Sequence, residues 1–341
     1  MRGFTRAAAA ATAVSACLAA AGCGIVSAGE RDVVSVYSGR HYDLEQAFRD
    51  FADDTGISVE FLYGGDAELL ERIRAEGEDT PADVFMTVDA GNLWLAAEDG
   101  MLMPVQSRRL DEAVPRGLRD PQDRWIGLSM RARTVMYNPE RVDPGEFDPV
   151  ETYADLADPR WRGRLCMRDS TSPYTQSLVA SLIDAHGYAG ARDIVAGWVA
   201  NDVDIVSTDI ELLETVDAGG CDVALANHYY LARLLEEDPD LSVRPYWANQ
   251  QGRGVHVNIS GAGVVAQSDN PGLARRLIEW LATQGQNSFV DGNHEYPVNP
   301  AVQPTALIAG FGRFDYEPIN AAAYGDLNAE AVRLMAEAGY E

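Results

Sequence analysis

The chain has 341 residues, of which 46% are hydrophobic and 23% are charged, and this length predicts two domains or one domain of two lobes. The composition excludes a disordered chain, collagen, a coiled coil and a multi-pass membrane protein. The 53 acidic residues outnumber the 27 basic ones, all of them arginine, which gives a net charge of −26. A surface this acidic repels nucleic-acid phosphates, so a role in binding DNA or RNA is not expected.

Residues 1–23 have the layout of an export signal. Arg2 and Arg6 precede an apolar, alanine-rich run, as the positive region of a signal peptide precedes its apolar core. The run ends in Ala20-Ala21-Gly22-Cys23, which resembles the bacterial lipobox, except that Ala20 stands where leucine is usual. We therefore predict an exported protein anchored to the cell membrane by lipid on Cys23. The alternative is an ordinary secretory signal cut near Ala21, which leaves a soluble periplasmic or secreted protein.

Two cysteines, Cys166 and Cys221, remain after this predicted processing. An even pair in an oxidising compartment predicts a disulfide. Two buried free thiols are the alternative.

The mature chain alternates predicted strands and helices. The first predicted elements are a strand at 33–37, a helix with Asp43 as its N-cap, a strand at 58–63, a helix at 67–76 and a strand at 82–88. This β-α-β-α-β order at short spacing predicts a parallel sheet with helices on both faces. The same alternation returns in a strand at 164–168, a helix at 176–185, a strand at 221–226 and a helix at 231–237. A further helix opens at Asn270-Pro271, with proline at its first position.

Two long β-rich runs, 124–138 and 254–267, interrupt this alternation. Each is long enough to cross from one sheet to another. The architecture predicted from the residues is therefore two α/β lobes joined by two crossing strands. We place residues 31–130 and 255–300 in lobe 1, and residues 131–254 and 301–341 in lobe 2.

Enzyme motifs fail on inspection. The run Gly261–Ala266 matches the dinucleotide pattern G-x-G-x-x-A, but that pattern needs its glycines between a strand and a helix, and here they lie within a predicted strand. The sequence contains no G-x-S-x-G, H-E-x-x-H, Walker A or C-x-x-C motif. His41 with Asp43 or Glu45 is the one conceivable acid–base pair, and no candidate nucleophile accompanies it. We therefore do not expect an enzyme.

Tyrosines, in contrast, gather after predicted strand ends. Tyr42, Tyr174 and the pair Tyr229-Tyr230 each follow a strand, where open α/β sheets bind their ligands. A single tyrosine is more often a packed ring with a satisfied hydroxyl, but a cluster of phenols has one notable use. Phenols ionise at neutral pH only beside a strong cation, and hard trivalent iron is such a cation. Binding would then release protons.

Several collinear stretches carry a family resemblance across nearly the whole mature chain. They are residues 37–42, 67–77, 81–94, 131–138, 156–164, 174–181, 226–234, 256–265 and 295–298. Together they resemble the ferric-iron-binding proteins of bacterial ABC importers, in the tyrosine-rich, cyanobacterial-like branch of the bacterial transferrins. The resemblance implies the two-lobed type II periplasmic-binding-protein fold, with the ligand in the cleft between the lobes and two crossing hinge strands.

The resemblance also implies roles for individual residues. Tyr229 and Tyr230 match the adjacent ligand tyrosines of the family. Tyr42 and Tyr174 match the further phenols of the tyrosine-rich branch. His41 matches a histidine that coordinates iron in some members and stands back in others.

The surroundings of the site follow from the same resemblance. Arg133 matches a basic residue near the metal, where it could neutralise phenolate charge, and Arg131 is the neighbouring alternative. Val88 stands where another branch has a glutamate ligand. With that glutamate missing, the tyrosines must carry the site, and water or a small anion must fill any vacancy.

The implied function is that of an exported substrate-binding protein. It would capture ferric iron as transported ligand and deliver it, as a monomer, to an ABC permease and its ATPase. The alternative is a binding protein for a polyamine or another small organic solute on the same fold. Polyamine sites favour aromatic boxes with several carboxylates, whereas this sequence offers adjacent tyrosines and arginine.

Overall fold

The computed structural model describes residues 32–40 and 45–341, and Asp32–Glu341 form one compact unit. The predicted signal sequence with Cys23, the predicted ligands His41 and Tyr42, and the predicted cap Asp43 lie outside the described residues.

The first group of elements matches the predicted β-α-β-α-β order. Its strands and helices are β1 (Val33–Ser38), α1 (Glu45–Thr55), β2 (Ser58–Tyr63), α2 (Asp66–Glu76), β3 (Val84–Thr87), α3 (Ala90–Glu98), β4 (Leu102–Met103) and α4 (Arg108–Ala113). β1 lies between β2 and β3 and is parallel to both, as predicted. The apolar faces of α1 and α2 are buried, with Phe51 and Leu70 in the core.

A second α/β group follows further along the chain. It contains α5 (Thr152–Asp155), β6 (Leu165–Arg168), α6 (Pro173–Ala200), β7 (Asp204–Val206), α7 (Asp209–Asp217), β8 (Val223–Asn227) and α8 (His228–Glu237). β6 is parallel to β7 and to β8. The predicted helix at 176–185 was too short at both ends. α6 begins at Pro173 and continues to Ala200 across a non-helical residue, Gly187, with φ 68°.

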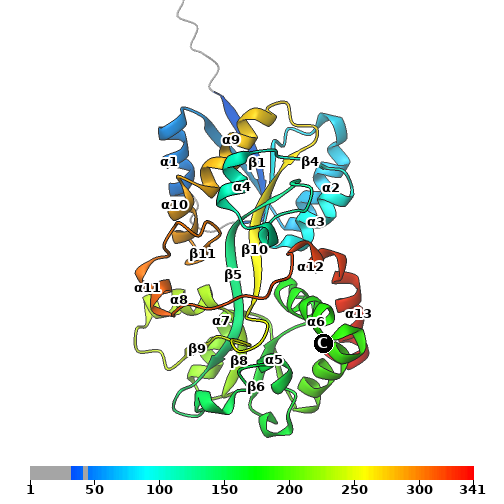
Figure 1. Cartoon of the computed structure of the whole chain (residues 1–341), viewed down its shortest axis with the longest axis vertical. Coiled ribbons are helices and arrows are strands. Elements are labelled where there is room, and N and C mark those ends of the chain that lie inside the picture. The colour runs from blue at the N-terminus through cyan, green and yellow to red at the C-terminus, as the bar shows by residue number, and fades with distance from the viewer. Residues whose placement is uncertain (1–31, 41–44) are drawn as a thin grey trace, which may run out of the picture. The chain divides into compact units, whose positions relative to one another are not determined.

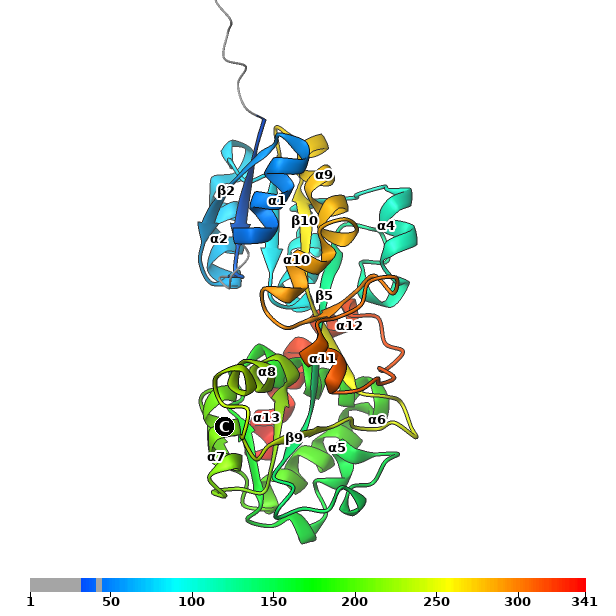
Figure 2. The ribbon, with the colours of Figure 1, turned by 90° about the vertical axis from the view of Figure 1, so that its left-hand side faces the viewer.

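Two long strands join the groups, as predicted. β5 (Ile126–Tyr137) and β10 (His256–Val265) are antiparallel neighbours, from His256 opposite Arg133 to Ala262 opposite Ile126. β3 pairs with β10 and β8 pairs with β5, so the strands follow one another in the order β2-β1-β3-β10-β5-β8-β6-β7. The two lobes therefore share one continuous sheet instead of having separate sheets (Figures 1 and 2).

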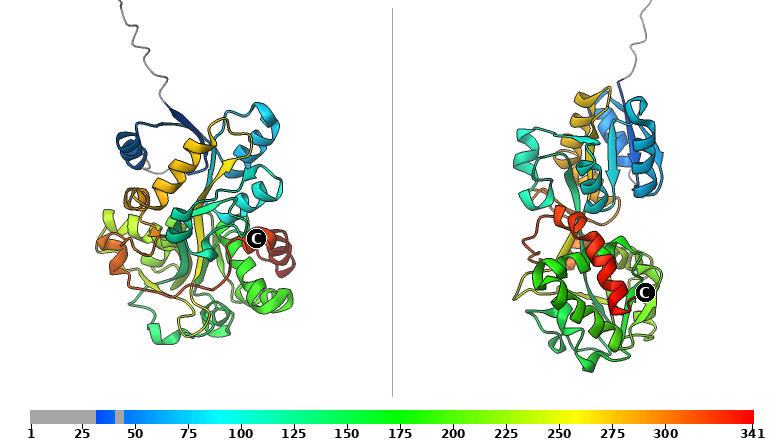
Figure 3. Two further views of the ribbon diagram at one scale, coloured as in Figure 1. Left: turned by 45° about the horizontal axis from the view of Figure 1, so that its top comes forward. Right: turned by 90° about the vertical axis from the view of Figure 1, so that its right-hand side faces the viewer.

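The remaining elements cover the lobes and the junction between them. They are β9 (Arg244–Tyr246), α9 (Pro271–Ala282), α10 (Gln286–Asp291), β11 (Tyr296–Pro297), α11 (Ala306–Gly310), α12 (Ala322–Asp326) and α13 (Asn328–Ala338). Short 3-10 turns occupy Gly77–Asp79, Arg116–Leu118, Pro144–Glu146 and Pro159–Trp161. α13 packs along α6, and α12 contacts both α3 and α6 (Figure 3). Proline opens α9 at Pro271, as predicted.

The glycines of the G-x-G-x-x-A pattern lie inside β10. A Cβ on Gly261 would lie 2.7 Å from the carbonyl oxygen of Ile126, and one on Gly263 would lie 2.8 Å from that of Arg124. These glycines therefore permit close packing of neighbouring backbone, and the next helix, α9, begins only at Pro271. The dinucleotide motif is thus excluded by its structural context. Among the described residues, no helix combines the length and apolar character needed to span a membrane.

Cys166 and Cys221 form a disulfide, with their Cα atoms 6.0 Å apart. Cys166 lies in β6, and Cys221 lies just before β8. The bond therefore links two neighbouring strands of the second lobe. The residue ranges assigned to the two lobes remain a prediction.

Candidate metal centre

Tyr229 and Tyr230 lie in the first turn of α8, directly after β8. The helix was expected to begin at Leu231, but it begins at His228 and so includes both tyrosines. Tyr229 is fully buried and Tyr230 is partly buried. Their ring centroids are 4.3 Å apart, so the two phenols form one aromatic cluster at the end of β8.

Tyr174 joins this cluster from a second helix. It is the second residue of α6, and therefore lies in a helical turn where a loop was expected. Nη1 of Arg131 donates to the Tyr174 hydroxyl at 3.3 Å, and the Arg131 guanidinium carbon lies 4.9 Å from the centre of the Tyr229 ring. One buried guanidinium from β5 thus contacts phenols from two helices. Arg233 adds a second cation, 5.5 Å from the ring centres of both Tyr229 and Tyr230.

Arg131 is held in place by a buried carboxylate. Glu295 accepts from Nε of Arg131 at 3.0 Å and from Nη1 of Arg40 at 2.8 Å. All three side chains are at most 1% exposed. Burial by itself would raise the pKa of Glu295, but Arg131, Arg40 and the hydroxyl of Ser129 lower it to about 2. Glu295 is therefore an anion at every physiological pH.

Arg133, the basic residue predicted nearest the phenols, has other partners. Its guanidinium donates to Asp209 at 2.9 Å and to the carbonyl oxygen of Leu225 at 2.8 Å. Asp209 also accepts from Arg168 at 2.8 Å. Arg131, the alternative, is the arginine that contacts the phenols directly, and the role of either arginine near a metal stays a prediction. Arg133 is connected to the cluster through Asn227, which accepts from Arg133 at 3.4 Å and donates from its amide nitrogen to the Tyr229 hydroxyl at 3.2 Å.

The arginine cluster around Glu295 gives the site a positive surplus. Arg40 and Arg131 share the carboxylate of Glu295, so this cluster has one more positive than negative charge. Arg133 and Arg168 share the carboxylate of Asp209, and Arg168 also pairs with Asp169 at 3.7 Å, so the charges of that second cluster balance. Burial raises the pKa of Tyr229 well above its ordinary value, and the charge of Arg131 opposes that rise. The phenol thus stays protonated until a stronger cation arrives, and the arginines lower the cost of its ionisation.

His228 directly precedes the tyrosine pair, and both nitrogens of its ring contact backbone groups. Its Nδ1 accepts from the amide of Ala132 at 3.2 Å, and its Nε2 lies 3.0 Å from the carbonyl oxygen of His294. A neutral ring protonated on Nε2 satisfies both contacts. Burial lowers the pKa of His228 to about 4, so this histidine anchors the first turn of α8.

Val88 uses its backbone at the position where another branch has a glutamate ligand. Its N–H donates to Asp66 at 3.1 Å, and its carbonyl oxygen accepts from Arg131 at 3.2 Å. Burial and the neighbouring Asp89 raise the pKa of Asp66. A Cβ on Gly39 would lie 1.5 Å from Asp66 Oδ1, so only glycine fits between Asp66 and the chain that leads to His41 and Tyr42.

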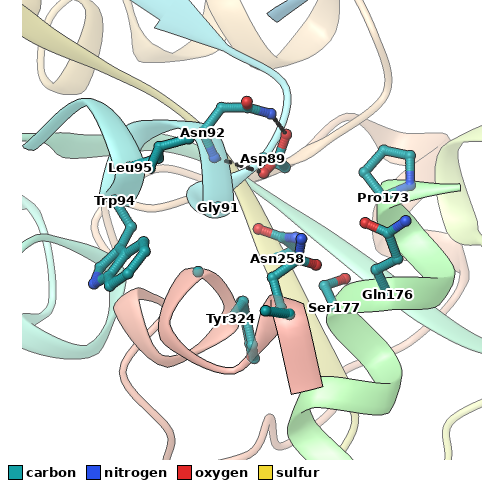
Figure 4. A pocket seen from close by; sticks show the side chains of 13 residues that line it. Asp89, Gly91, Asn92, Trp94, Leu95, Pro173, Gln176, Ser177, Asn258 and Tyr324 are labelled. Carbon is teal, nitrogen blue, oxygen red and sulfur yellow. Dashed lines mark hydrogen bonds between the residues drawn. The ribbon is translucent and has the colours of Figure 1, made fainter. Parts of the chain in front are cut away.

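A cavity of about 270 Å³ lies between α3, α6 and α12 (Figure 4). Ser177 and Asn258 contribute to its wall, and Nδ2 of Asn258 has no hydrogen-bond partner within residues 32–40 and 45–341. None of the described residues that line it is basic, and Tyr229 and Tyr230 are not among them. The cavity therefore neighbours the phenol cluster without sharing its charged groups.

Sequence reasoning missed four of the residues that shape this site, namely Arg40, Asp209, Asn227 and Glu295. Asn227, Glu295 and Arg40 lay within the stretches that carry the family resemblance, but nothing in their spacing indicated which side chains they contact. Asp209, at the start of α7, lay outside those stretches and carried no signal at all.

Comparison with known proteins gives consistent results. Residues 79–309 match the model of a family described as bacterial extracellular solute-binding protein. The chain is 41% identical over 322 residues to iron uptake protein A1 of Synechocystis sp., covering 92% of this chain and 89% of that protein. It is 28% identical to the Fe(3+)-binding periplasmic protein of Serratia marcescens, with 90% of each chain covered.

Solved structures show the same relationship. A Trichodesmium protein (IdiA, FutA), solved in complex with iron and citrate, superposes with a TM-score of 0.86 at 42% identity, covering 91% of this chain and 100% of that one. The ferric binding protein of Campylobacter jejuni gives a TM-score of 0.83 at 31% identity, covering 90% and 100%. Both comparisons support the two-lobed type II fold.

Proposed function

The chain belongs to the bacterial extracellular solute-binding proteins, and we propose that it captures ferric iron for uptake into the cell. The metal would be held between the lobes by the phenolates of Tyr174, Tyr229 and Tyr230, together with Tyr42. His41 is the fifth proposed ligand. The gathering of phenols from α6 and α8 around the buried guanidinium of Arg131 is the observation that carries this proposal.

The chemistry of the donor set favours ferric iron over an organic solute. Phenolate oxygens are hard, anionic donors that suit a hard trivalent cation. The positive surplus of Arg40 and Arg131 over Glu295 offsets part of the negative charge that several phenolates bring. Relatives named for iron uptake and for Fe(3+) binding, with coverage of about nine-tenths of this chain, support the same ligand.

Delivery completes the proposed role. The family consists of extracellular solute-binding proteins, and we infer that this member passes iron to an ABC permease driven by its ATPase. Lipid on Cys23 would hold the monomeric protein at the membrane surface. Growth of a strain carrying Cys23→Ala, followed by cell fractionation, tests the anchor, because the variant should leave the membrane fraction.

The ferric site is tested by a metal titration. Protein expressed from Gly24 onwards and stripped by chelator is titrated with ferric citrate while the visible spectrum is recorded. A tyrosinate-to-iron charge-transfer band should grow and saturate at one equivalent. It should disappear in the variant Tyr229→Phe/Tyr230→Phe, because losing two of the four proposed phenolates should abolish iron binding.

A matched control removes two phenols elsewhere. Tyr63 is 48% exposed on β2 and Tyr188 lies on α6, where its hydroxyl contacts Arg333. The variant Tyr63→Phe/Tyr188→Phe should keep the full band. A wild-type protein that stays colourless and retains no iron would refute the ferric site and leave an organic-solute receptor as the better account.

A further inference from the structure

We propose that Glu295 is a positioning residue of the iron site, which acts by fixing Arg131 against the phenols. This inference rests on the proposed function, since its effect is read through ferric iron. Glu295 lies just before β11 and contacts none of the three described phenols in any hydrogen bond of the structure. Its influence therefore has to pass through the guanidinium groups that it holds, and Arg131 is the one that contacts the phenols.

The geometry makes Glu295 a clamp on Arg131. Nε of Arg131 donates to Glu295 Oε1 at 3.0 Å, and Nη2 lies 2.9 Å from the same oxygen as an ion-pair contact, so one carboxylate oxygen lies against one edge of the guanidinium. The remaining nitrogen, Nη1, is thereby directed at the Tyr174 hydroxyl and the carbonyl oxygen of Val88, at 3.3 and 3.2 Å. A guanidinium is planar, so fixing one edge fixes the direction of the others.

The same carboxylate also holds Arg40. Its Oε2 accepts from Arg40 Nη1 at 2.8 Å, and Arg40 directly precedes His41 and Tyr42 in the sequence. Arg40 Nη2 donates further to the carbonyl oxygen of Phe289 at 3.1 Å. Glu295 thus connects the backbone leading to one set of proposed ligands with the arginine that faces the other set.

Stability alone is a weak explanation for this buried ion cluster. Burying a carboxylate and two guanidinium groups carries a large desolvation cost, and a well-packed apolar replacement is often equally stable. Ser129 and Asn293 also donate to Glu295, so its orientation is fixed by neutral groups as well. Arg131 contacts a proposed ligand directly, and replacing such a partner of a metal ligand typically changes metal affinity 10- to 100-fold. Glu295 would share in this effect by holding Arg131.

The test is a double-mutant cycle in which the affinity for ferric iron is measured for each variant. Glu295→Asp keeps the buried charge but shortens the side chain by one methylene, so it cannot hold both arginines. Ferric affinity is measured by competition with citrate at the charge-transfer band, for the wild type, Glu295→Asp, Arg131→Met and the double variant. Glu295→Asp should lower affinity about 10- to 100-fold and shift the band maximum.

The double variant decides whether Glu295 acts through Arg131. With Arg131 replaced, Glu295 still holds Arg40, so any effect of Glu295→Asp that persists in the Arg131→Met background passes through Arg40. If Glu295 acts through Arg131, that remaining effect on affinity should be less than about twofold. Additive losses, or an unchanged affinity and band in Glu295→Asp, would overturn the inference. A wild type without the band refutes the proposed function instead, so the two failures are distinguishable.

A matched control separates this role from the loss of any buried acid. Asp222 also joins two arginines, accepting from Arg164 at 2.7 Å and from Arg141, but it lies before β8, at the end opposite Asn227. Asp222→Asn should leave the band and the affinity unchanged. Glu295→Gln provides a second variant at the tested position. It should lower affinity and, in the Arg131→Met background, have no further effect.

Discussion

His228 couples the stability of the ligand helix α8 to pH. Its buried ring has a pKa of about 4 in the folded protein and an ordinary value near 6.5 when unfolded. The unfolded chain therefore binds the extra proton first, and the stabilisation is fully present above pH 6.5 and lost as the pH falls towards 4. We expect the apo protein to lose on the order of 3 kcal/mol of unfolding free energy from this residue over that range.

Urea unfolding of the apo protein at pH 7, 6, 5 and 4 measures this loss. His228→Gln should be less stable at pH 7 but show a flatter dependence on pH. Glu295 serves as an internal reference. Because its pKa in the folded protein is about 2, the stabilisation that it contributes is lost only below about pH 4.3. Parallel pH curves for the wild type and His228→Gln would show that His228 does not titrate in this window.

At the scale of elements, the ends of strands were easier to predict than the starts of helices. β2 was predicted with its bounds, since a β-branched and aromatic run ended at Gly64-Gly65. α8 was predicted to begin three residues late, because Asn227 gives α8 no side-chain cap and His228 is held by backbone contacts from β5 and from the chain before β11. Both segments that supply these contacts are distant from α8 in the sequence. No local sequence pattern could therefore predict that the helix begins at His228.

The choice between Arg131 and Arg133 shows the same limit at the site. The two residues lie two positions apart on β5 and therefore point to the same face of the strand. What separates them is Glu295, 164 residues away from Arg131, and Asp209, 76 residues away from Arg133. Strand periodicity and the family resemblance could predict that both arginines lie near the cleft. Their roles differ because each arginine pairs with a different carboxylate in the folded protein.

The disulfide between β6 and the start of β8 should stabilise the second lobe without being needed for metal binding. It closes a segment of 55 residues, for which chain entropy predicts a stabilisation of about 4 kcal/mol. The pairing of Leu165 with Val223 keeps the strands adjacent when the bond is absent. Cys166→Ala/Cys221→Ala should therefore unfold at lower urea concentration while keeping the ferric charge-transfer band.

Reduction supplies the comparison for that variant. Wild-type protein in excess dithiothreitol should unfold like Cys166→Ala/Cys221→Ala, whereas the variant itself should not respond to the reductant. A variant as stable as the oxidised wild type would show that the bond contributes no net stability. A variant that loses the band would show that β6 and β8 need the bond to hold Tyr174 and Tyr229 in register.

At the scale of the whole molecule, the proposed ligands come from both ends of the shared sheet. Tyr42 follows β1 of the first lobe, whereas Tyr174 and Tyr229 begin helices of the second. β5 and β10 are the strands that run through both groups, so we expect a metal bound by all these phenols to draw the lobes together about this pair of strands. Small-angle X-ray scattering of stripped and iron-loaded protein should show a smaller radius of gyration in the loaded form.

Tyr42→Phe isolates the contribution of the first lobe to this closure. The second-lobe phenols remain, so the variant should still acquire colour, with weaker binding, but its radius of gyration should fall less than that of the wild type. Tyr63→Phe, which removes an exposed phenol from β2 of the same lobe, should contract like the wild type. If Tyr42→Phe contracts fully, Tyr42 is not the group that joins the lobes, and Arg131, which already contacts Val88 in one lobe and Tyr174 in the other, becomes the better candidate for that role.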